Sequence, residues 1–256
     1  NRDGMFERAA ATYSDPDAAK YIWGVGYHWY GDARFETWPR RSEVAYEDRQ
    51  KKFAPIFELR ARNGFDNVRR VAELRPDKHI LFTEGCQELG GRPLQEALGL
   101  WKYGERYAMN IISDLNSGTE GWIDWNLYLD ETGGPNHRGN LCVAPIICDT
   151  KNDQALYQPA FWYVGHFSRY IKPGARRVLS SSSRDVLEVV SFLNLDGSLA
   201  VVVMNQSEDK INFWLKLPDG AVKTTALPRS ITTFVVDDGA DGEGAAGPPP
   251  HPAARL

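Results

Sequence analysis

Long hydrophobic runs and paired cysteines are missing from this 256-residue sequence. No stretch of about 18 consecutive apolar residues occurs, so the sequence predicts no integral membrane segment. The three cysteines, Cys86, Cys142 and Cys148, contain no CxxC pair, and an odd count gives no disulfide framework. Cysteine usage therefore does not decide between an oxidising and a reducing compartment.

A strong excess of one charge is also absent. The 30 Lys and Arg residues against 34 Asp and Glu leave a formal net charge of −4, which argues against nucleic-acid or anionic-membrane partners. The chain begins with Asn1-Arg2-Asp3, and so with neither an initiator methionine nor a signal peptide. Localisation stays open, and we expect a secreted or lysosome-like protein if an upstream region carries a signal peptide.

Aromatic residues, by contrast, are plentiful, with 8 Trp, 11 Tyr and 11 Phe. Together with a hydrophobic content of 42% they are enough to fill a core, which excludes a wholly disordered chain. Flat aromatic faces also cover the apolar faces of sugars, so the same rings fit a carbohydrate site. Composition alone leaves both roles open, and core packing is the commoner one.

Residues 79–87 are the most informative stretch. A short apolar run ends at Glu84, which Gly85 follows directly. This pattern is typical of a buried parallel strand that delivers an acid to the mouth of an α/β barrel, where reactive side chains lie at the carboxyl ends of the strands. Glu84 is therefore the first candidate for catalysis. The alternative is a strand-end carboxylate that caps the next helix or pairs with an arginine.

Hydrophobic periodicity predicts helices and strands in alternation over residues 1–174. Helices are expected at residues 5–13, 46–62, 65–74, 95–115 and 159–171, with a short turn from Asp15-Pro16. Strands are expected at residues 22–30, 79–83 and 121–127, with long loops at 31–41 and 130–148. The glycines of the first strand, Gly24 and Gly26, are expected where another segment approaches closely.

From Arg176 the apolar period changes to two, which predicts a small antiparallel β domain. Segments 186–193 and 199–204 flank Asp196-Gly197, a hairpin signal, and further strands are expected at 211–217 and 231–236. We divide the chain into a partial barrel domain at residues 1–174, a β-sandwich domain at 175–236 and a disordered Gly/Ala/Pro tail at 237–256.

The number of strands leads to a further expectation. Three parallel strands do not close a barrel, which needs eight strands and typically about 250 residues. We therefore expect the chain to be the carboxyl-terminal portion of something larger. A three-stranded sheet would expose an apolar edge, so we expect this segment expressed alone to be insoluble or molten.

Four motifs occur in order along the chain. They are Phe82-Thr83-Glu84-Gly85-Cys86, Gly121-Trp122-Ile123-Asp124-Trp125-Asn126-Leu127, Gly133-Gly134-Pro135-Asn136 and Gly165-His166-Phe167-Ser168-Arg169-Tyr170-Ile171. Together they resemble glycoside hydrolase family 30, specifically its glucosylceramidase branch, and the similarity extends to about Val236. The resemblance implies fold class α/β plus β: the C-terminal part of a (β/α)8 TIM barrel, about strands six to eight, followed by an antiparallel β-sandwich. It also implies cleavage of glucosylceramide or a related β-glucoside with retention of configuration.

The same resemblance implies roles for residues near the strand ends. Glu84 matches the family's catalytic nucleophile, and Tyr30 matches a tyrosine whose hydroxyl lies near it and favours its charged state. His28 matches a histidine of the active-site network. From the residues alone, Tyr30 is a surface aromatic at a strand end, and His28 is a hydrogen-bonded core histidine with no second ligand at metal spacing.

Three further residues are expected at or behind the site. Trp125 matches the tryptophan that lines the glucose subsite, although plain core packing is the better interpretation from the residue alone. Asn140 matches an asparagine at the rim. Arg2 is expected as a charge partner behind the site.

A retaining enzyme needs a second carboxylate about 5 Å from the nucleophile. The family's acid/base glutamate follows an asparagine at the end of strand four, and no Asn-Glu dipeptide occurs in these 256 residues. We therefore expect this chain alone to be inactive because it is truncated. Neither a metal nor another cofactor is implied, since the two carboxylates need none.

Two alternatives stay open. Related family members act on β-xylan or β-1,6-glucan, and residues 137–139, Leu141 and Val143 depart from the glucosylceramidase branch in a loop near the entrance, which leaves the aglycone undetermined. Alternatively, the chain is not an enzyme but an inactive truncated fragment: a gene-model fragment, a pseudogene product or a sugar-binding remnant. The oligomeric state is not predicted.

Overall fold

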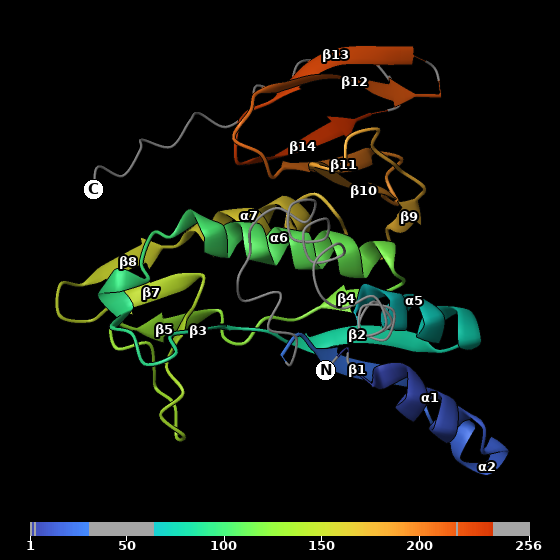
Figure 1. Ribbon diagram of the computed structural model, residues 1–256, viewed down its shortest axis with the longest axis horizontal. Coiled ribbons are helices and arrows are strands. Elements are labelled where there is room, and N and C mark those ends of the chain that lie inside the picture. Colours follow the sequence, from blue (N-terminus) through green and yellow to red (C-terminus); the bar gives the residue numbers. More distant parts are fainter. Residues whose placement is uncertain (1, 3, 31–63, 219, 238–256) are drawn as a thin grey trace, which may run out of the picture.

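The computed structural model describes residues 2, 4–30, 64–218 and 220–237. They form three layers: a parallel sheet, the helices α6 (Trp101–Asn116) and α7 (Pro159–Ser168), and a set of antiparallel strands (Figure 1). The loop expected at 31–41, the helix expected at 46–62 and the tail expected beyond Asp237 lie outside the described residues.

The first layer is the parallel sheet, with strand order β1-β2-β4. Its strands are β1 (Gly24–His28), β2 (His79–Glu84) and β4 (Gly121–Trp122). The helices α1 (Met5–Tyr13), α2 (Pro16–Ala19) and α5 (Phe65–Leu74) form where periodicity places them. Asp15 caps α2, because its carboxylate accepts hydrogen bonds from the next two non-proline backbone N–H groups. Strands that alternate with helices in this way build a (β/α) barrel.

Gly24 is needed where β1 and β2 meet. A Cβ atom at this position would lie 2.2 Å from the carbonyl oxygen of His79, its partner in the strand pairing. A Cβ at Gly26 would meet the side chain of Thr83 at 3.1 Å. The close approach expected from the two glycines is confirmed.

The helix expected at residues 95–115 begins later, at Trp101. Residues Leu94–Glu96 form a short 3-10 turn, η2, and Gly99 adopts a left-handed backbone conformation with φ of 69°, which ends that turn before the helix starts. The helix α7 packs directly on α6: a Cβ at Gly104 would lie 2.4 Å from the Tyr163 ring. This helix ends at Ser168, three residues short of the expected Ile171.

Two expectations for residues 121–148 are wrong in extent. The last parallel strand ends at Trp122 rather than Leu127. Beyond it, the segment keeps single backbone hydrogen bonds to the β2 side, from Ile123 N–H to the Phe82 oxygen and from Trp125 N–H to the Gly85 oxygen. Short strands within the expected loop pair with each other and with strands outside it, in two small sheets. They are β3 (Gln87–Glu88) with β6 (Cys142–Val143), and β5 (Tyr128–Asp130) with β7 (Ile146–Asp149) and β8 (Gln154–Tyr157).

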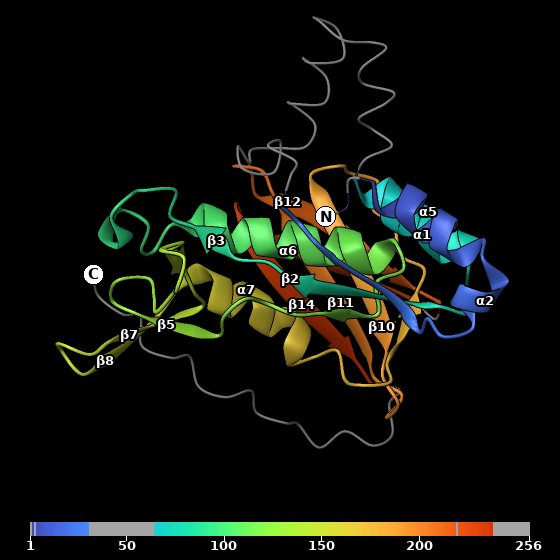
Figure 2. The ribbon, with the colours of Figure 1, turned by 90° about the horizontal axis from the view of Figure 1, so that it is seen from below.

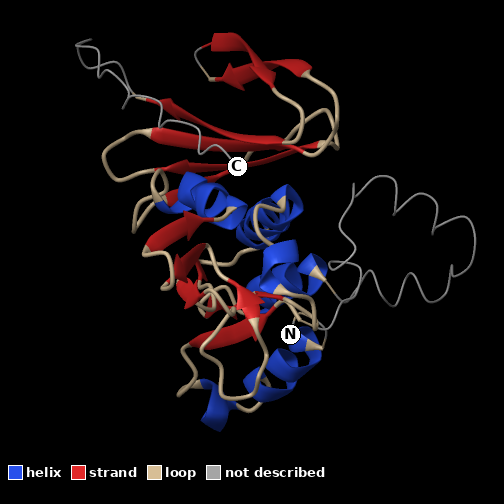
Figure 3. Ribbon diagram, turned by 90° about the vertical axis from the view of Figure 1, so that its left-hand side faces the viewer, coloured by secondary structure: helices blue, strands red, loops and turns tan. Residues whose placement is uncertain are grey.

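The third layer is the predicted antiparallel β domain (Figure 3). One sheet has the order β14-β11-β10-β9, and β12 pairs with β13 in a hairpin above it. The strands are β9 (Arg176–Val178), β10 (Leu187–Leu193), β11 (Leu199–Asn205), β12 (Ile211–Leu217), β13 (Gly220–Ala226) and β14 (Ser230–Val236). The hairpin at Asp196-Gly197 is confirmed, with Leu193 opposite Leu199 and Gly197 at φ of 87°. The sequence did not predict β13.

Helices α6 and α7 lie between the two sheets (Figure 1), and from below the three layers overlap (Figure 2). A hydrophobic cluster joins them to β10 and β11, and includes Ile112, Phe167, Val190 and Val202. The structure therefore combines part of a barrel with a β-sandwich that is packed on the barrel's helices.

Candidate active site

Glu84 and His28 end neighbouring parallel strands. The pairing of β1 with β2 contains an irregularity, so that Tyr27 stands opposite Phe82 while His28 stands opposite Glu84. Because the carboxyl ends of parallel strands meet at one edge, the two side chains lie close together. The Nδ1 atom of His28 is 3.9 Å from the Oε1 atom of Glu84. Glu84 is 28% exposed, so the carboxylate is reachable from solvent.

Tyr30 lies on the same side as these two residues. Burial, followed by contacts with Cys86 and Glu84, raises the pKa of the Tyr30 hydroxyl well above its ordinary value. The hydroxyl therefore stays protonated and can donate a hydrogen bond to the carboxylate of Glu84 or to the sulfur of Cys86. Its ring meets the His28 ring edge-on at 5.8 Å. The structure thus brings together Glu84, His28 and Tyr30.

Trp125 is tied to the residue that follows Glu84. Its backbone N–H donates to the carbonyl oxygen of Gly85 at 2.9 Å, and its side chain is 45% exposed, so the core-packing interpretation is wrong. The preceding residue, Asp124, accepts a hydrogen bond from the hydroxyl of buried Tyr107 at 3.0 Å. Burial raises the pKa of Asp124 to about 7 against the opposing effect of that hydrogen bond.

Asn140 is exposed on the loop before β6. Its side-chain N–H group donates to the Oε1 atom of Glu88 at 3.0 Å, and Asn136 accepts a hydrogen bond from its backbone. Asn140 is thus connected to the Glu84 segment through β3, four residues beyond the candidate nucleophile. Its place at the rim of the site stays a prediction from the resemblance.

Arg2 is buried where strands β1 and β2 meet α6. Its guanidinium makes two hydrogen bonds to the carboxylate of Asp114 in α6, at 3.0 and 2.6 Å, and both side chains are almost fully buried. The guanidinium lies over the rings of Phe65 and Phe82. Arg2 is therefore the charge partner of Asp114, and it touches the strand that carries Glu84 at Phe82.

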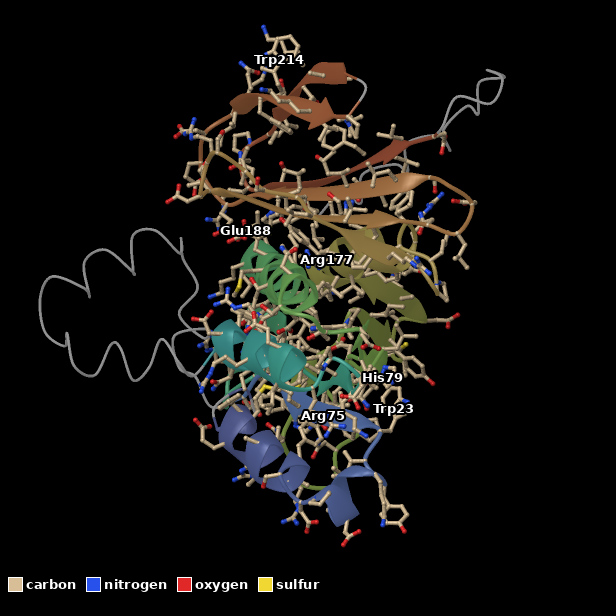
Figure 4. All side chains as sticks on the ribbon, turned by 90° about the vertical axis from the view of Figure 1, so that its right-hand side faces the viewer. Trp23, Arg75, His79, Arg177, Glu188 and Trp214 are labelled. Carbon is tan, nitrogen blue, oxygen red and sulfur yellow. The ribbon has the colours of Figure 1, made fainter. Side chains whose placement is uncertain are left out.

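The opposite end of β2 is built differently. His79, the first residue of the strand, stacks on Trp23 with 4.0 Å between ring centroids and contacts Glu120 at 2.6 Å (Figure 4). Within the part of the chain that the structure describes, the conjunction of Glu84, His28 and Tyr30 marks the carboxyl end of the strands as the candidate site.

The sequence did not predict two residues that lie at the carboxyl end of the parallel strands. Cys86 contacts Tyr30, and its sulfur lies 2.9 Å from that of Cys142. The position of Cys86 two residues after Glu84 is a signal that could have singled it out. Cys142 is 56 residues away along the chain, and no pattern in one sequence links the two.

Residues 2, 4–30, 64–218 and 220–237 contain no cluster of three or more His, Cys, Asp or Glu side chains that could hold a metal ion. Over the same residues, no helix is both long enough and apolar enough to cross a membrane.

Two domain families match this chain. Residues 61–171 match the glycosyl hydrolase family 30 TIM-barrel domain, and residues 174–234 match the glycosyl hydrolase family 30 beta sandwich domain. Lysosomal acid glucosylceramidase of Mus musculus is 34% identical over 232 residues, which are 89% of this chain and 39% of the mouse protein. The chain thus spans well under half the length of this relative.

Solved structures of family 30 enzymes and related proteins are similar to this chain. SrfJ from Salmonella typhimurium superposes with a TM-score of 0.74 at 31% identity, over 93% of this chain and 46% of that one. Two more distant structures share the fold. The endo-beta1,6-glucanase BT3312 has a TM-score of 0.66 at 22% identity, over 88% of this chain and 43% of that one. A GH30 endoxylanase from Clostridium papyrosolvens C71 has a TM-score of 0.60 at 13% identity, over 93% of this chain and 54% of that one. Because the two family descriptions together match most of its length, this chain belongs to glycoside hydrolase family 30.

Proposed function

We propose that the full-length protein carrying this chain is a retaining β-glycosidase that hydrolyses glucosylceramide or a related β-glucoside, with Glu84 as its nucleophile. The observation that carries the proposal is the arrangement of Glu84, partly exposed at the end of β2, with His28 at 3.9 Å and the Tyr30 hydroxyl in contact. A carboxylate at this edge of a barrel, held by a neutral donor, is suited to attack a sugar carbon.

In the proposed reaction, a carboxylate oxygen of Glu84 attacks the anomeric carbon and the bond to the leaving oxygen breaks. The Tyr30 hydroxyl orients the carboxylate before the attack by donating a hydrogen bond. Water then cleaves the glycosyl-enzyme ester and restores Glu84, so the configuration is retained. The exposed face of Trp125 would cover the sugar ring, Asn140 would border the entrance, and the Arg2–Asp114 pair would support β2 from behind.

The leaving oxygen needs a proton from a second carboxylic acid about 5 Å from the nucleophile. We assign this role to a glutamate outside this chain, because the 256 residues contain no Asn-Glu dipeptide and span 39% of the mouse relative's length. The chain alone is accordingly proposed to be inactive. No metal or other cofactor takes part in this scheme.

The choice of a β-glucoside rests on sequence similarity. The mouse glucosylceramidase is 34% identical to this chain, whereas the glucanase and the endoxylanase resemble it at 22% and 13% identity. The exposed ring of Trp125 suits the sugar of a glycolipid as well as that of a plain glucoside, so we include both kinds of aglycone.

The test compares four substrates with the purified full-length protein: an aryl β-glucoside, the corresponding xylo-configured aryl glycoside, β-xylan and a β-1,6-glucan. We expect the aryl β-glucoside to be hydrolysed with a kcat/KM at least about tenfold above that for the corresponding xylo-configured aryl glycoside. Preferred cleavage of either polysaccharide would replace the substrate part of the proposal. Inversion of configuration, read by NMR of the first product formed, would overturn the mechanism itself.

A further inference from the structure

Cys86 and Cys142 lie in contact beside the candidate site. Their sulfur atoms are 2.9 Å apart, and each residue is 2% exposed. The segments that carry them are held together by the pairing of β3 with β6, with Gln87 opposite Val143 and Glu88 opposite Cys142. A disulfide has a sulfur–sulfur bond of about 2.05 Å, so the two atoms would have to approach by roughly 0.9 Å.

Both sulfur atoms also touch residues of the proposed active site. Cys86 stands two residues after Glu84 and accepts a hydrogen bond from Tyr30, which in turn contacts Glu84. The Cys142 sulfur lies 3.5 Å from the carbonyl oxygen of Asn140. Oxidation of the cysteine pair would therefore change the surroundings of Tyr30, the hydrogen-bond donor to Glu84, and of Asn140.

The two thiols are not equivalent. A hydrogen bond from Cys142, together with the one from Tyr30, lowers the pKa of the Cys86 thiol despite its burial. The hydrogen bond to Cys86, followed by burial, raises the pKa of the Cys142 thiol. Cys86 therefore has more thiolate character, and the thiolate is the form that reacts with oxidants. Cys142 is positioned as its resolving partner.

We propose that Cys86 and Cys142 form a reversible oxidation site for small hydroperoxides, which closes to a disulfide and slows the proposed hydrolase. A small oxidant is required because both thiols are buried, and it would reach them past Tyr30 and the partly exposed Glu84. The effect on turnover rests on the proposed function, whereas formation of the disulfide does not.

The chemistry balances with hydrogen peroxide as the oxidant. The Cys86 thiolate attacks one peroxide oxygen, an S–O bond forms, the O–O bond breaks, and the released hydroxide takes up the thiol's proton to give water. The Cys142 sulfur then attacks the Cys86 sulfenic acid, an S–S bond forms, and the hydroxyl leaves with the Cys142 proton as a second water. Two thiols lose two electrons to one peroxide, and a dithiol reductant reverses the reaction by exchange.

The test maps the cross-link in the folded full-length protein. Trypsin leaves Cys86 in the peptide 79–102, because Arg92 precedes proline, but leaves both Cys142 and Cys148 in the peptide 139–151. The experiment therefore uses the Cys148→Ser variant, treated with hydrogen peroxide, alkylated and digested without reduction. We expect peptides 79–102 and 139–151 to be joined in most molecules and to separate after dithiothreitol.

A matched variant tests the resolving role. Cys142→Ser leaves Cys86 without a partner, so we expect sulfinic acid at Cys86 that dithiothreitol does not remove. In the folded Cys148→Ser protein, unmodified cysteines after peroxide, or sulfinic acid at Cys86 without a cross-link, would overturn the proposal. Intrinsic fluorescence and circular dichroism before oxidation verify that each variant is folded.

Activity is a separate readout. We expect oxidised Cys148→Ser to hydrolyse an aryl β-glucoside about tenfold more slowly than its reduced form, with recovery in dithiothreitol. Drawing the two sulfur atoms together shifts Cys86, which contacts Tyr30 and lies two residues after Glu84, and so displaces the nucleophile from its reactive position. A cross-link that leaves the rate unchanged would refute the regulatory part. A cross-link in a protein that hydrolyses no glycoside would count against the proposed function and leave the oxidation site standing.

Discussion

At the scale of single residues, Tyr30 connects the candidate nucleophile Glu84 to Cys86. Its protonated hydroxyl has two acceptors, a carboxylate and a sulfur, and the balance between them sets how well Glu84 is held. A hydrogen bond to a charged group contributes about 1.5–3 kcal/mol, so each member of this group should be visible in kinetics.

Replacing the carboxylate of Glu84 is the most severe change. We expect Glu84→Gln in the full-length protein to lower kcat by about 10³-fold or more on an aryl β-glucoside, since an amide cannot form the glycosyl-enzyme ester. The control is Glu120→Gln, which removes an exposed carboxylate at the opposite end of the sheet, next to His79. Equal activity of the two variants would contradict the assignment.

Removing only the hydroxyl of Tyr30 should be milder. Tyr30→Phe keeps the ring that meets His28 but removes the donor to Glu84, and we expect kcat/KM to fall by about 10- to 100-fold. Tyr21→Phe, at a side chain that is 82% exposed, is the matched control. Steady-state kinetics on both variants measures the difference, and a fall of less than twofold in Tyr30→Phe would argue against a role for this hydroxyl.

Residue roles were foreseeable only in part. Glu84 could be singled out from its own neighbourhood, because an apolar run that ends in an acid and a glycine describes a strand end. The contacts of His28 and Tyr30 depend on the register between β1 and β2, including its irregularity after Tyr27, which no single segment contains. The Arg2–Asp114 pair joins residues 112 positions apart and was expected only as an unspecified charge partner.

At the scale of elements, α6 is held to the N-terminal segment by a buried ion pair. Removing one partner of such a pair costs about 3–5 kcal/mol, because the remaining charge stays buried. We therefore expect Arg2→Met to lower the free energy of unfolding by that amount. The double variant Arg2→Met with Asp114→Leu should lose less free energy of unfolding, since no buried charge is then left without a partner. Urea unfolding measures both.

The control for this prediction is Arg69→Met, which breaks an exposed ion pair with Asp66 on α5. Exposed pairs contribute about 0–1 kcal/mol, so little change is expected. A cost for Arg2→Met that is no greater than the cost for Arg69→Met would show that the buried pair does not support the sheet.

Elements with a strong period were predicted well, and short ones were not. Helices α1 and α5 and strands β10, β11 and β12 have apolar faces long enough to set their own boundaries. Strands β3 and β6 have two residues each and exist only because they pair with each other across the loop. Similarly, α6 begins later than expected because Gly99 adopts a left-handed backbone conformation. The spacing of apolar residues does not predict that conformation.

At the scale of the whole molecule, α6 and the β-sandwich are joined by an ion pair between Glu105 and Arg229. Trp101 and Tyr163 also donate to the backbone oxygen of Arg229. Burial raises the pKa of Glu105 from 4.5 to about 6, although Arg229 opposes the shift. The folded protein therefore holds this proton more tightly than the unfolded chain does.

The sign of the pH dependence follows from that shift. The contribution of Glu105 to stability is fully present below pH 4.5 and is lost as the pH rises through about 6, which amounts to about 2 kcal/mol. We expect Glu105→Gln to remove this fall, so the difference in unfolding free energy between variant and wild type should change by that amount between pH 4 and pH 7. Urea unfolding at several pH values tests it, and a difference that stays constant across this range would contradict the prediction.

The proposed mechanism requires that a carboxylate oxygen of Glu84 forms the covalent bond to the sugar. The most direct measurement treats the full-length protein with a 2-deoxy-2-fluoro glucoside, which traps the glycosyl-enzyme, and sequences the labelled tryptic peptide by mass spectrometry. Peptide 79–102 contains Glu84, Glu88 and Glu96, so fragmentation must locate the label. We predict a label on Glu84 alone, and a label on either of the other two glutamates, or on another peptide, would contradict its role as the nucleophile.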